Sequence, residues 1–154
     1  MIRSIAAIAA VILVTALIVS CRQQPAGTAT VTVGGQHRFT CEVMDNPQSR
    51  AKGLSGRDSL HPLSGMLFVF DRPDRHGIWM KDMSFPIDII WIREGRIVHL
   101  QHMALPEDVP SDAYLTVYRP DEPADMVLEL RGGMAEAFKF AVGQTVEVDI
   151  DSGR

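Results

Sequence analysis

The sequence predicts a single compact, strand-rich domain of the mostly β or α+β class, with two short helices. The chain has 154 residues, a length that fits one domain. In several segments apolar and polar side chains alternate every second residue, as they do in half-buried strands. Glycine and proline separate these segments, and the sequence contains no heptad and no internal repeat. Strands are therefore expected to build most of the core.

The first 20 residues predict a secretory signal segment rather than part of the fold. Arg3 is the only charged residue among them, and an uncharged, mostly apolar stretch follows it. The stretch ends in Leu-Ile-Val-Ser-Cys at residues 17–21, which resembles a bacterial lipobox. This resemblance implies cleavage before Cys21 and lipidation of its sulfur, which would anchor the chain to a membrane. The alternative is an uncleaved membrane helix, for which about 17 apolar residues is at the short limit.

A lipidated Cys21 and a flexible tether are predicted over residues 21–30, because no large apolar side chain follows the cysteine there. The folded domain is then expected to cover residues 31–150. Without Arg3, the chain has 14 basic and 19 acidic side chains. This balance disfavours a nucleic-acid-binding protein, which usually has a basic face.

The first part of the domain predicts a β-hairpin and then a short helix. Val31 and Val33 open a strand that is expected to turn at the two glycines 34–35. Residues 38–44 alternate, which predicts a half-buried second strand. Asn46 is a suitable helix cap, Pro47 suits the first turn, and the glycines at 53 and 56 would end a helix over residues 46–54.

The middle of the domain predicts buried strands. Residues 65–70 are continuously apolar, which is typical of a strand covered on both faces. A polar loop is expected over residues 71–77, and a short strand over 78–80. Residues 87–92 are apolar except for Asp88, and a turn at 93–96 would return the chain into a strand over 97–103, which predicts a hairpin.

The last part of the domain begins with an acidic, proline-containing loop over residues 105–112. Short strands are expected over 114–118 and 126–130. Residues 133–141 have helical composition, and Gly143 would end that helix. Residues 145–150 alternate and predict a final strand.

Several of these segments together resemble the domain-of-unknown-function 192 family across residues 39–150. The resemblance depends on the order and spacing of Arg50–Leu54, Gly65–Phe70, the long block Trp79–Ile92, Val127–Leu130 and Gly143. It implies one small strand-rich domain, often exported or membrane-attached, and no agreed activity. The sequence departs from the pattern at Asp82, where the family more often has a neutral Asn, so a role for an amide does not carry over to this position.

The block around Trp79 offers a candidate ligand site. An aromatic side chain beside Lys81, next to a polar loop, could form an apolar shelf on which the lysine holds an anion. Asp88 would belong to the same site, with Arg50 and Arg57 as further anion contacts. The competing interpretation is structural, with Trp79 covering the core and Lys81 paired with Asp88 or with another neighbour.

Asp88 and Glu129 are the candidate acids. Asp88 lies in an apolar run, so its carboxylate needs either a cation, such as Lys81, Arg50 or Arg57, or several N–H donors. It is therefore either a buried structural acid or a functional one. Glu129 lies between Leu128 and Leu130, and alternation would allow it simply to face solvent. Either acid could serve an envelope hydrolase, although the sequence contains no nucleophile motif.

Copper(I) binding is a minor alternative. Met80, Met83, His99, His102 and Met103 supply thioether and imidazole groups that suit this ion. However, His99 and His102 would point to opposite faces of a strand, and methionine commonly fills cores. No metal site and no cofactor are therefore predicted. Cys41 is expected to be a buried free thiol, because it shares a strand face with Phe39 and Val43.

Together these observations predict an exported lipoprotein of the cell envelope that acts as a non-enzymatic binding or accessory module. The lipid anchor would hold it at the inner membrane, the outer membrane or the cell surface. Its partner would be a small anionic ligand or an envelope protein. The lipobox, the tether and the lack of a catalytic motif motivate this hypothesis.

Overall fold

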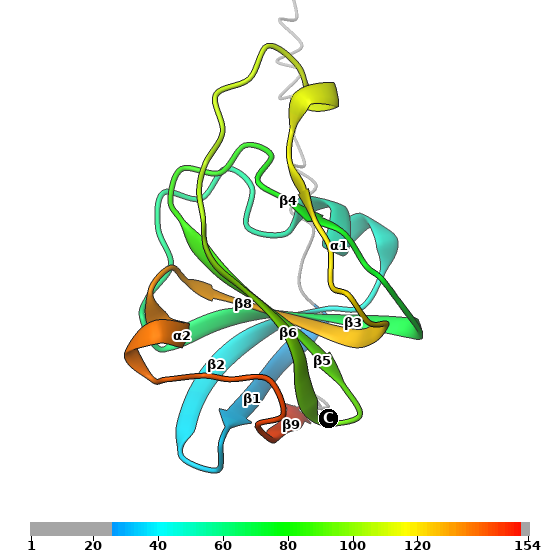
Figure 1. The fold of residues 1–154 in the computed structure, drawn as a ribbon, viewed down its shortest axis with the longest axis vertical. Coiled ribbons are helices and arrows are strands. Elements are labelled where there is room, and N and C mark those ends of the chain that lie inside the picture. The colour runs from blue at the N-terminus through cyan, green and yellow to red at the C-terminus, as the bar shows by residue number, and fades with distance from the viewer. Residues whose placement is uncertain (1–25, 152–154) are drawn as a thin grey trace, which may run out of the picture.

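A computed structural model of the chain describes residues 26–151 (Figure 1). Seven strands form the main sheet in the order β6-β5-β8-β3-β2-β1-β9, and β4 and β7 form a second, two-stranded sheet. The strands are β1 (Gly27–Val33), β2 (His37–Met44), β3 (Ser64–Asp74), β4 (Ile78–Trp79), β5 (Ile87–Arg93), β6 (Arg96–Ala104), β7 (Val117–Tyr118), β8 (Ala124–Arg131) and β9 (Val146–Asp151). Two short α-helices, α1 (Pro47–Lys52) and α2 (Met134–Ala137), and a 3₁₀ turn at Asp112–Tyr114 complete the described fold. The single strand-rich domain predicted from the sequence is confirmed.

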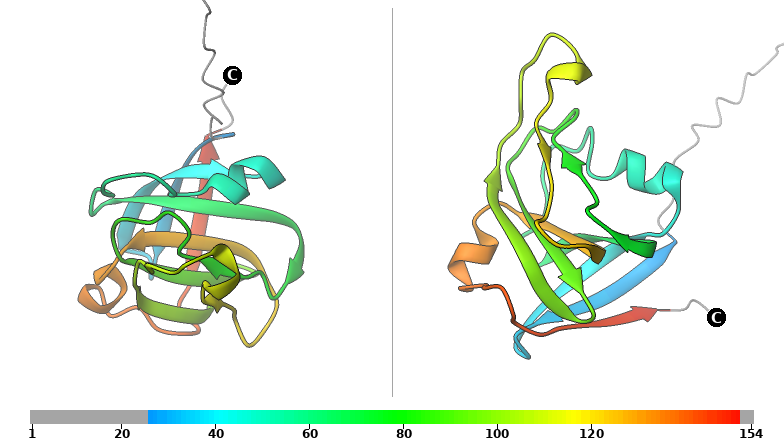
Figure 2. Two further views of the ribbon diagram at one scale, coloured as in Figure 1. Left: turned by 90° about the horizontal axis from the view of Figure 1, so that it is seen from above. Right: turned by 45° about the vertical axis from the view of Figure 1, so that its right-hand side comes forward.

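The main sheet curls until its two edge strands meet. It is antiparallel except where β2 pairs with β3. At one end, the chain before β9 bonds to the start of β6, where the Ile97 amide donates to the Gln144 carbonyl at 3.0 Å and the Val146 amide donates to the Gly95 carbonyl at 2.8 Å. Figure 2 shows the resulting half-closed barrel, with β9 and β6 brought toward each other. Closing the edges in this way satisfies backbone groups that an open sheet would expose.

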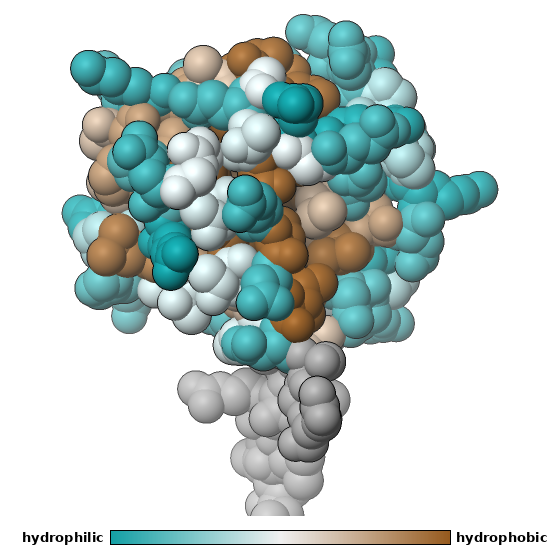
Figure 3. Space-filling model, turned by 90° about the horizontal axis from the view of Figure 1, so that it is seen from below, coloured by the Kyte–Doolittle hydropathy of each residue, from teal (hydrophilic) through white to brown (hydrophobic). Residues whose placement is uncertain are grey.

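The concave face of the sheet holds one hydrophobic core. Strands from both halves contribute to it, including Val31, Phe39, Ile90 and Leu128, all almost completely buried. α2 adds Ala135 from one end. The end of the molecule seen from below shows an apolar strip between polar side chains (Figure 3).

The convex face holds a second core, which α1 and the β4–β7 sheet cover. Met66, Ile89 and Trp91 point to this side from the main sheet, and Leu54 and Ile78 pack onto it from the covering segments. Both faces of the central strands are buried. Side chains that point to either face of β3, β5 and β8 therefore lie in apolar surroundings. This arrangement determines the setting of both candidate acids.

The two predicted hairpins and the start of α1 follow local sequence signals. Gly34 and Gly35 have positive φ values of 61° and 72°, as the β1–β2 turn requires. Asn46 caps α1, and its side chain accepts a bond from the Ser49 amide at 2.9 Å. The β5–β6 hairpin forms as predicted, with Trp91 opposite His99.

Several predicted boundaries differ from the structure. The strand predicted over residues 114–118 is only Val117–Tyr118, because residues 112–114 form the 3₁₀ turn. The predicted tether is too long at its C-terminal end, because β1 begins at Gly27 and residues 28–30 pair with both β2 and β9. Ala29 is buried there. A segment of small residues can therefore form a strand where it has a neighbouring strand on each side. β3 continues to Asp74 through an irregularity after Val69, where a loop was expected. α2 has only four residues, fewer than the predicted 133–141 segment.

The signal segment, Cys21 and the first residues of the tether lie outside the described residues. Within residues 26–151, no helix has the length and apolar character needed to cross a membrane.

Candidate functional site

A pocket of about 240 Å³ lies on the convex face of the sheet, between α1, β4 and the floor formed by β3, β5 and β8. Most of its lining is apolar, and three side chains bring charge or acidity to it. The lining residues are Arg50, Ala51, Lys52, Gly53, Leu54, Ser55, Phe68, Phe70, Gly77, Ile78, Trp79, Met83, Ile87 and Glu129. An apolar cleft with a few polar groups is the usual form of a small-ligand site.

Glu129 belongs to the pocket floor and is 5% exposed. Its neighbours across the sheet are Met66 on β3 and Ile89 on β5, both fully buried. Among residues 26–151, no side chain or backbone group forms a hydrogen bond or an ion pair with its carboxyl group. Burial raises the pKa of Glu129 to about 8, because an apolar environment disfavours the carboxylate. Glu129 is therefore mainly protonated at neutral pH and directed at the pocket.

Arg50 is held in place beside the pocket by three contacts. Its Nη1 donates to the Asp45 carbonyl at 2.7 Å and to the Val69 carbonyl at 2.9 Å. Its guanidinium carbon lies 5.0 Å from the centre of the Phe70 ring. None of these contacts neutralises the charge, and Nε and Nη2 have no partner within the described residues. Lys52, two residues after Arg50 in the last turn of α1, forms no ion pair with the described residues. The pocket therefore has two uncompensated cations.

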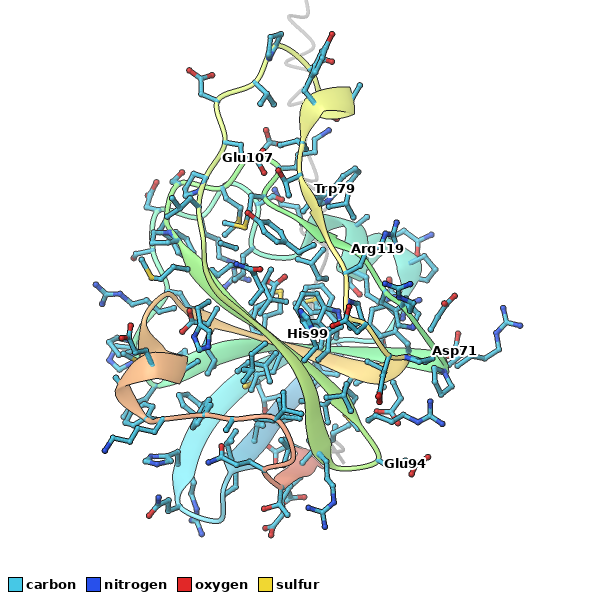
Figure 4. All side chains as sticks on the ribbon, in the orientation of Figure 1. Asp71, Trp79, Glu94, His99, Glu107 and Arg119 are labelled. Atoms are coloured by element: carbon cyan, nitrogen blue, oxygen red, sulfur yellow. The ribbon has the colours of Figure 1, made fainter. Side chains whose placement is uncertain are left out.

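The walls of the pocket are fastened to each other. The Ser55 hydroxyl donates to the Lys81 carbonyl at 2.8 Å, and the Gly56 amide donates to the Asp82 carbonyl at 2.8 Å. These bonds join the chain after α1 to the chain after β4. Trp79 lies at the rim and is 44% exposed. Figure 4 shows Trp79 and Arg119 on the covered side of the sheet, and Glu107 beyond them on the projecting arm, which is the chain between β6 and β7 (residues 105–116).

Lys81 and Arg57, two of the predicted anion contacts, have partners elsewhere. Lys81 forms an ion pair with Asp112 on the arm between β6 and β7. Arg57 forms a bidentate pair with Glu42, with contacts of 2.5 Å and 2.6 Å. This pair lowers the pKa of Glu42, because the guanidinium stabilises the carboxylate. Neither cation lines the pocket, so Trp79 and Arg50 alone among the five predicted ligand-binding residues lie there.

Asp88 has a structural setting, and of the two predicted alternatives it is N–H donors, not a cation, that hold its carboxylate. Its Oδ1 accepts a bond from the Met103 amide at 2.9 Å, and its Oδ2 accepts one from the Ala135 amide at 2.7 Å. Met103 has a φ of 49° at an irregularity of the β5–β6 pairing, and Ala135 lies in the first turn of α2. The buried carboxylate thus satisfies two backbone donors and fastens α2 and the bent end of β6 to β5.

Asp88 and Glu129 point to opposite faces of the sheet. Asp88 is opposite Leu130, whose side chain is in the concave core, and Glu129 is opposite Ile89, whose side chain is in the convex core. Side chains of paired residues share a face, so the two carboxyl groups cannot meet in one cleft. The interpretation of Glu129 as solvent-facing is also wrong, because α1 and β4 cover that side of β8.

Comparison with known proteins identifies the fold family. The model of the DUF192 family, described as "Uncharacterized ACR", matches residues 29–148. The chain belongs to the DUF192 family. A search of curated proteins finds no match.

Two solved structures share this DUF192 fold. A Sinorhizobium meliloti protein described as a "putative transcription regulator" is 28% identical with a TM-score of 0.72, over 80% of this chain and 95% of that one. A protein "of unknown function" from Novosphingobium aromaticivorans is 32% identical with a TM-score of 0.68, over 78% of this chain and 83% of that one.

The DUF192 signature block has a backbone role at Asp82. This residue has a φ of 53°, in the left-handed region that Asn and Asp tolerate better than most residues. Asn and Asp therefore serve equally well there for the turn after β4. Its carbonyl, and not its side chain, makes the bond that fastens the pocket wall.

Among the remaining candidates of this DUF192 domain, Met83 lines the pocket, and His99, Met80 and Cys41 do not. His99 packs edge-on against Trp91 and lies 3.5 Å from Asp121. Met80 is fully buried, and residues 26–151 contain no group of three His, Cys, Asp or Glu side chains able to hold a metal. Cys41 is a buried free thiol, as predicted, and burial raises its pKa to about 12.

Sequence reasoning did not identify Lys52, Phe68, Phe70 or the buried position of Glu129 as parts of the site. Phe68 and Phe70 read as ordinary core residues of a buried strand. Glu129 could have been found by one signal, since it interrupts an apolar run in the strand that turns out to be central to the sheet.

Proposed function

We propose that this DUF192 protein is an exported, lipid-anchored binding module that holds a small organic ligand in the pocket between α1, β4 and β8. The observation that carries the proposal is Glu129, a nearly buried and unpartnered acid that faces a preformed apolar pocket. A carboxyl group in this setting costs folding free energy unless something binds it. Perturbed acids of this kind cluster at functional sites.

The pocket's dimensions and chemistry support a small ligand with an apolar body. Its volume of about 240 Å³ is below the usual range for drug-sized ligands. Aromatic side chains line it, and Arg50 and Lys52 supply positive charge. An anionic group on the ligand is therefore favoured, in line with the small anionic ligand expected from the sequence.

Location at a membrane is a separate part of the proposal, and it depends on the Leu-Ile-Val-Ser-Cys segment ending at Cys21. A lipid anchor would display the domain without occupying its pocket. Mass spectrometry of the membrane-extracted protein tests this part: we expect an N-terminal Cys21 carrying a diacylglyceryl group. A mature chain that keeps Met1 would refute the anchor and leave the pocket proposal intact.

Trp79 makes the binding proposal directly testable. The chain has two tryptophans, and Trp91 is fully buried. Compounds from a fragment collection should change the emission of the wild-type protein and shift amide resonances of α1 and Glu129 in NMR spectra. The W79F variant should lose the emission change and keep the resonance shifts. If no compound at millimolar concentration shifts these resonances, or if shifts occur only elsewhere, the binding proposal is wrong.

An acid–base enzyme that uses Glu129 alone is the second candidate. It is favoured by one observation, the raised pKa of an acid that lies in a pocket. Hydrolysis of a panel of nitrophenyl esters by the wild-type protein, abolished in E129Q, would support this candidate. The same rate in both proteins would exclude it for those esters.

A further inference from the structure

We infer that the pocket is built for a small zwitterion, whose amine end reaches Glu129 and whose anionic end reaches Arg50 and Lys52. This inference rests on the proposed binding function and goes beyond it by naming the ligand's chemistry. It follows from how charge is distributed in the pocket: one acid in the floor and two cations on α1.

The acid end of the pocket suits an amine. Glu129 has no partner among the described residues, and Phe68 and Phe70 present aromatic rings to the same cavity. Aromatic faces attract cations, and a carboxylate without a counter-ion gains most from one that is also held by hydrogen bonds. A neutral hydroxyl would be a weaker partner, because Glu129 would stay protonated beside it and only a neutral hydrogen bond would form.

The cationic end of the pocket suits an anion. Arg50 keeps its Nε and Nη2 donors without partners in the described chain, while two backbone carbonyls fix its Nη1. A guanidinium fixed in this way is preorganised for a carboxylate or a phosphate. Lys52 adds a second positive charge, and its Nζ lies within 3.4 Å of where a Cβ on Gly56 would stand.

The strand geometry shows that the two ends of the pocket are separated along β3. Glu129 is opposite Met66, and Arg50 bonds the carbonyl of Val69 three residues further along the same strand. Three residues of strand span about 10 Å, so the amine and the anion of the ligand must be joined by a spacer and cannot be on adjacent atoms. A flexible chain of methylenes, as in 6-aminohexanoate, provides such a spacer and is therefore a suitable probe.

The other surroundings of Glu129 do not supply a competing charge. α1 contributes Arg50 and Lys52 to the pocket, and the lining from β3, β4 and β5 is entirely apolar. These two cations do not pair with Glu129, since burial alone accounts for its raised pKa. Binding of an ammonium group should therefore convert Glu129 from carboxylic acid to carboxylate, and its proton should leave for the solvent.

Titration calorimetry with the full-length protein at pH 7 tests the inference, with 6-aminohexanoate as the probe. Hexanoate lacks the amine, hexylamine lacks the anion, and 6-hydroxyhexanoate replaces the amine by a neutral donor. We expect 6-aminohexanoate to bind at least tenfold more tightly than each of the three. Measurements in buffers of different ionisation enthalpy should show release of nearly one proton for the zwitterion and none for hexanoate.

Two variants separate the two ends, and a third is the control. E129Q should weaken 6-aminohexanoate at least tenfold, abolish proton release and leave hexanoate unchanged. K52M should weaken 6-aminohexanoate and hexanoate alike, by about two- to fivefold, since it removes one of two cations. K139M, a lysine outside the pocket, is the matched control and should change nothing.

Equal binding of 6-hydroxyhexanoate and 6-aminohexanoate, or zwitterion binding without proton release, would overturn the inference. So would binding of hexylamine as tight as that of the zwitterion. If fragments still shift the pocket resonances in that case, the proposed binding function stands and only the ligand class is wrong.

Discussion

The burial of Glu129 can be measured by comparing how the unfolding free energies of the wild-type protein and of E129Q depend on pH. The pKa of Glu129 is about 8 in the folded protein and 4.5 without the fold. Because the folded pKa of this acid is raised, the folded state keeps a proton that the unfolded chain loses. The contribution to stability is therefore complete below about pH 4.5, and it falls as the pH rises toward 8.

The magnitude follows from the difference of about 3.5 between these two pKa values. At about 1.4 kcal/mol for each pKa unit, the unfolding free energy should fall by about 5 kcal/mol in total. Between pH 5 and pH 8 the expected fall is about 3 to 4 kcal/mol. This is a large part of the 5–15 kcal/mol that stabilises a typical domain. E129Q cannot ionise and should lack this component.

Urea unfolding of both proteins at pH 5, 6, 7 and 8, followed by the near-UV signal of Trp91, measures this difference. The histidines and the Glu42–Arg57 pair are common to both proteins, so they cancel when the two curves are subtracted. We expect E129Q to gain about 3 kcal/mol relative to wild type across this range. Curves that stay parallel within about 1 kcal/mol would show that Glu129 is solvated or paired, and would remove the main support for the binding site.

Further predictions concern the scaffold. D88A should lower the unfolding free energy by about 2–4 kcal/mol, because it leaves the Met103 and Ala135 amides without acceptors, and D88N should lower it by less. Equal stability of D88A and wild type in urea would contradict the structural role of Asp88. G65A should destabilise the domain by more than about 1 kcal/mol in thermal melts, because its Cβ would lie 2.9 Å from the Cys41 sulfur and a Leu130 methyl. Cys41 should resist alkylation by iodoacetamide in the native protein at pH 8 and react after denaturation. The half-exposed Arg57–Glu42 pair should contribute under about 1 kcal/mol, measured by a double-mutant cycle, and less in 1 M salt.

Strands were predictable from the sequence because their signals are local. Alternation in β2 and β9, the glycine pair of the first hairpin and the Asn46 cap each act over a few residues, and the structure follows them. The start of β1 was not predictable in the same way, since Gly27 and Ala29 have weak strand preference and Thr28 alone between them favours a strand. They become a strand because β2 and β9 offer backbone partners on both sides.

The candidate site was less predictable because it depends on sheet order. Asp88 was expected to need a cation or several N–H donors, and the donors come from Met103 and Ala135, which are distant in sequence. Alternation correctly placed the side chains of Glu129 and Leu128 on different faces of the sheet. It could not show that α1 and β4 cover the face on which Glu129 lies. Strand pairing and the crossing of covering segments are long-range properties, so no window of the sequence contains them.

The contrast between the two buried acids is the strongest argument that the convex pocket has a function. Asp88 is satisfied by two backbone amides, and removing it would damage the fold. Glu129 has no partner in the described chain and lowers stability at neutral pH, where leucine would fill the same position without that cost. A destabilising group that faces an open pocket, on a central strand and beside fixed cations, has a physical explanation if a ligand completes it. Two experiments test this explanation. The zwitterion titration supplies a partner for Glu129, and the pH series measures how much stability the protein loses because Glu129 has none.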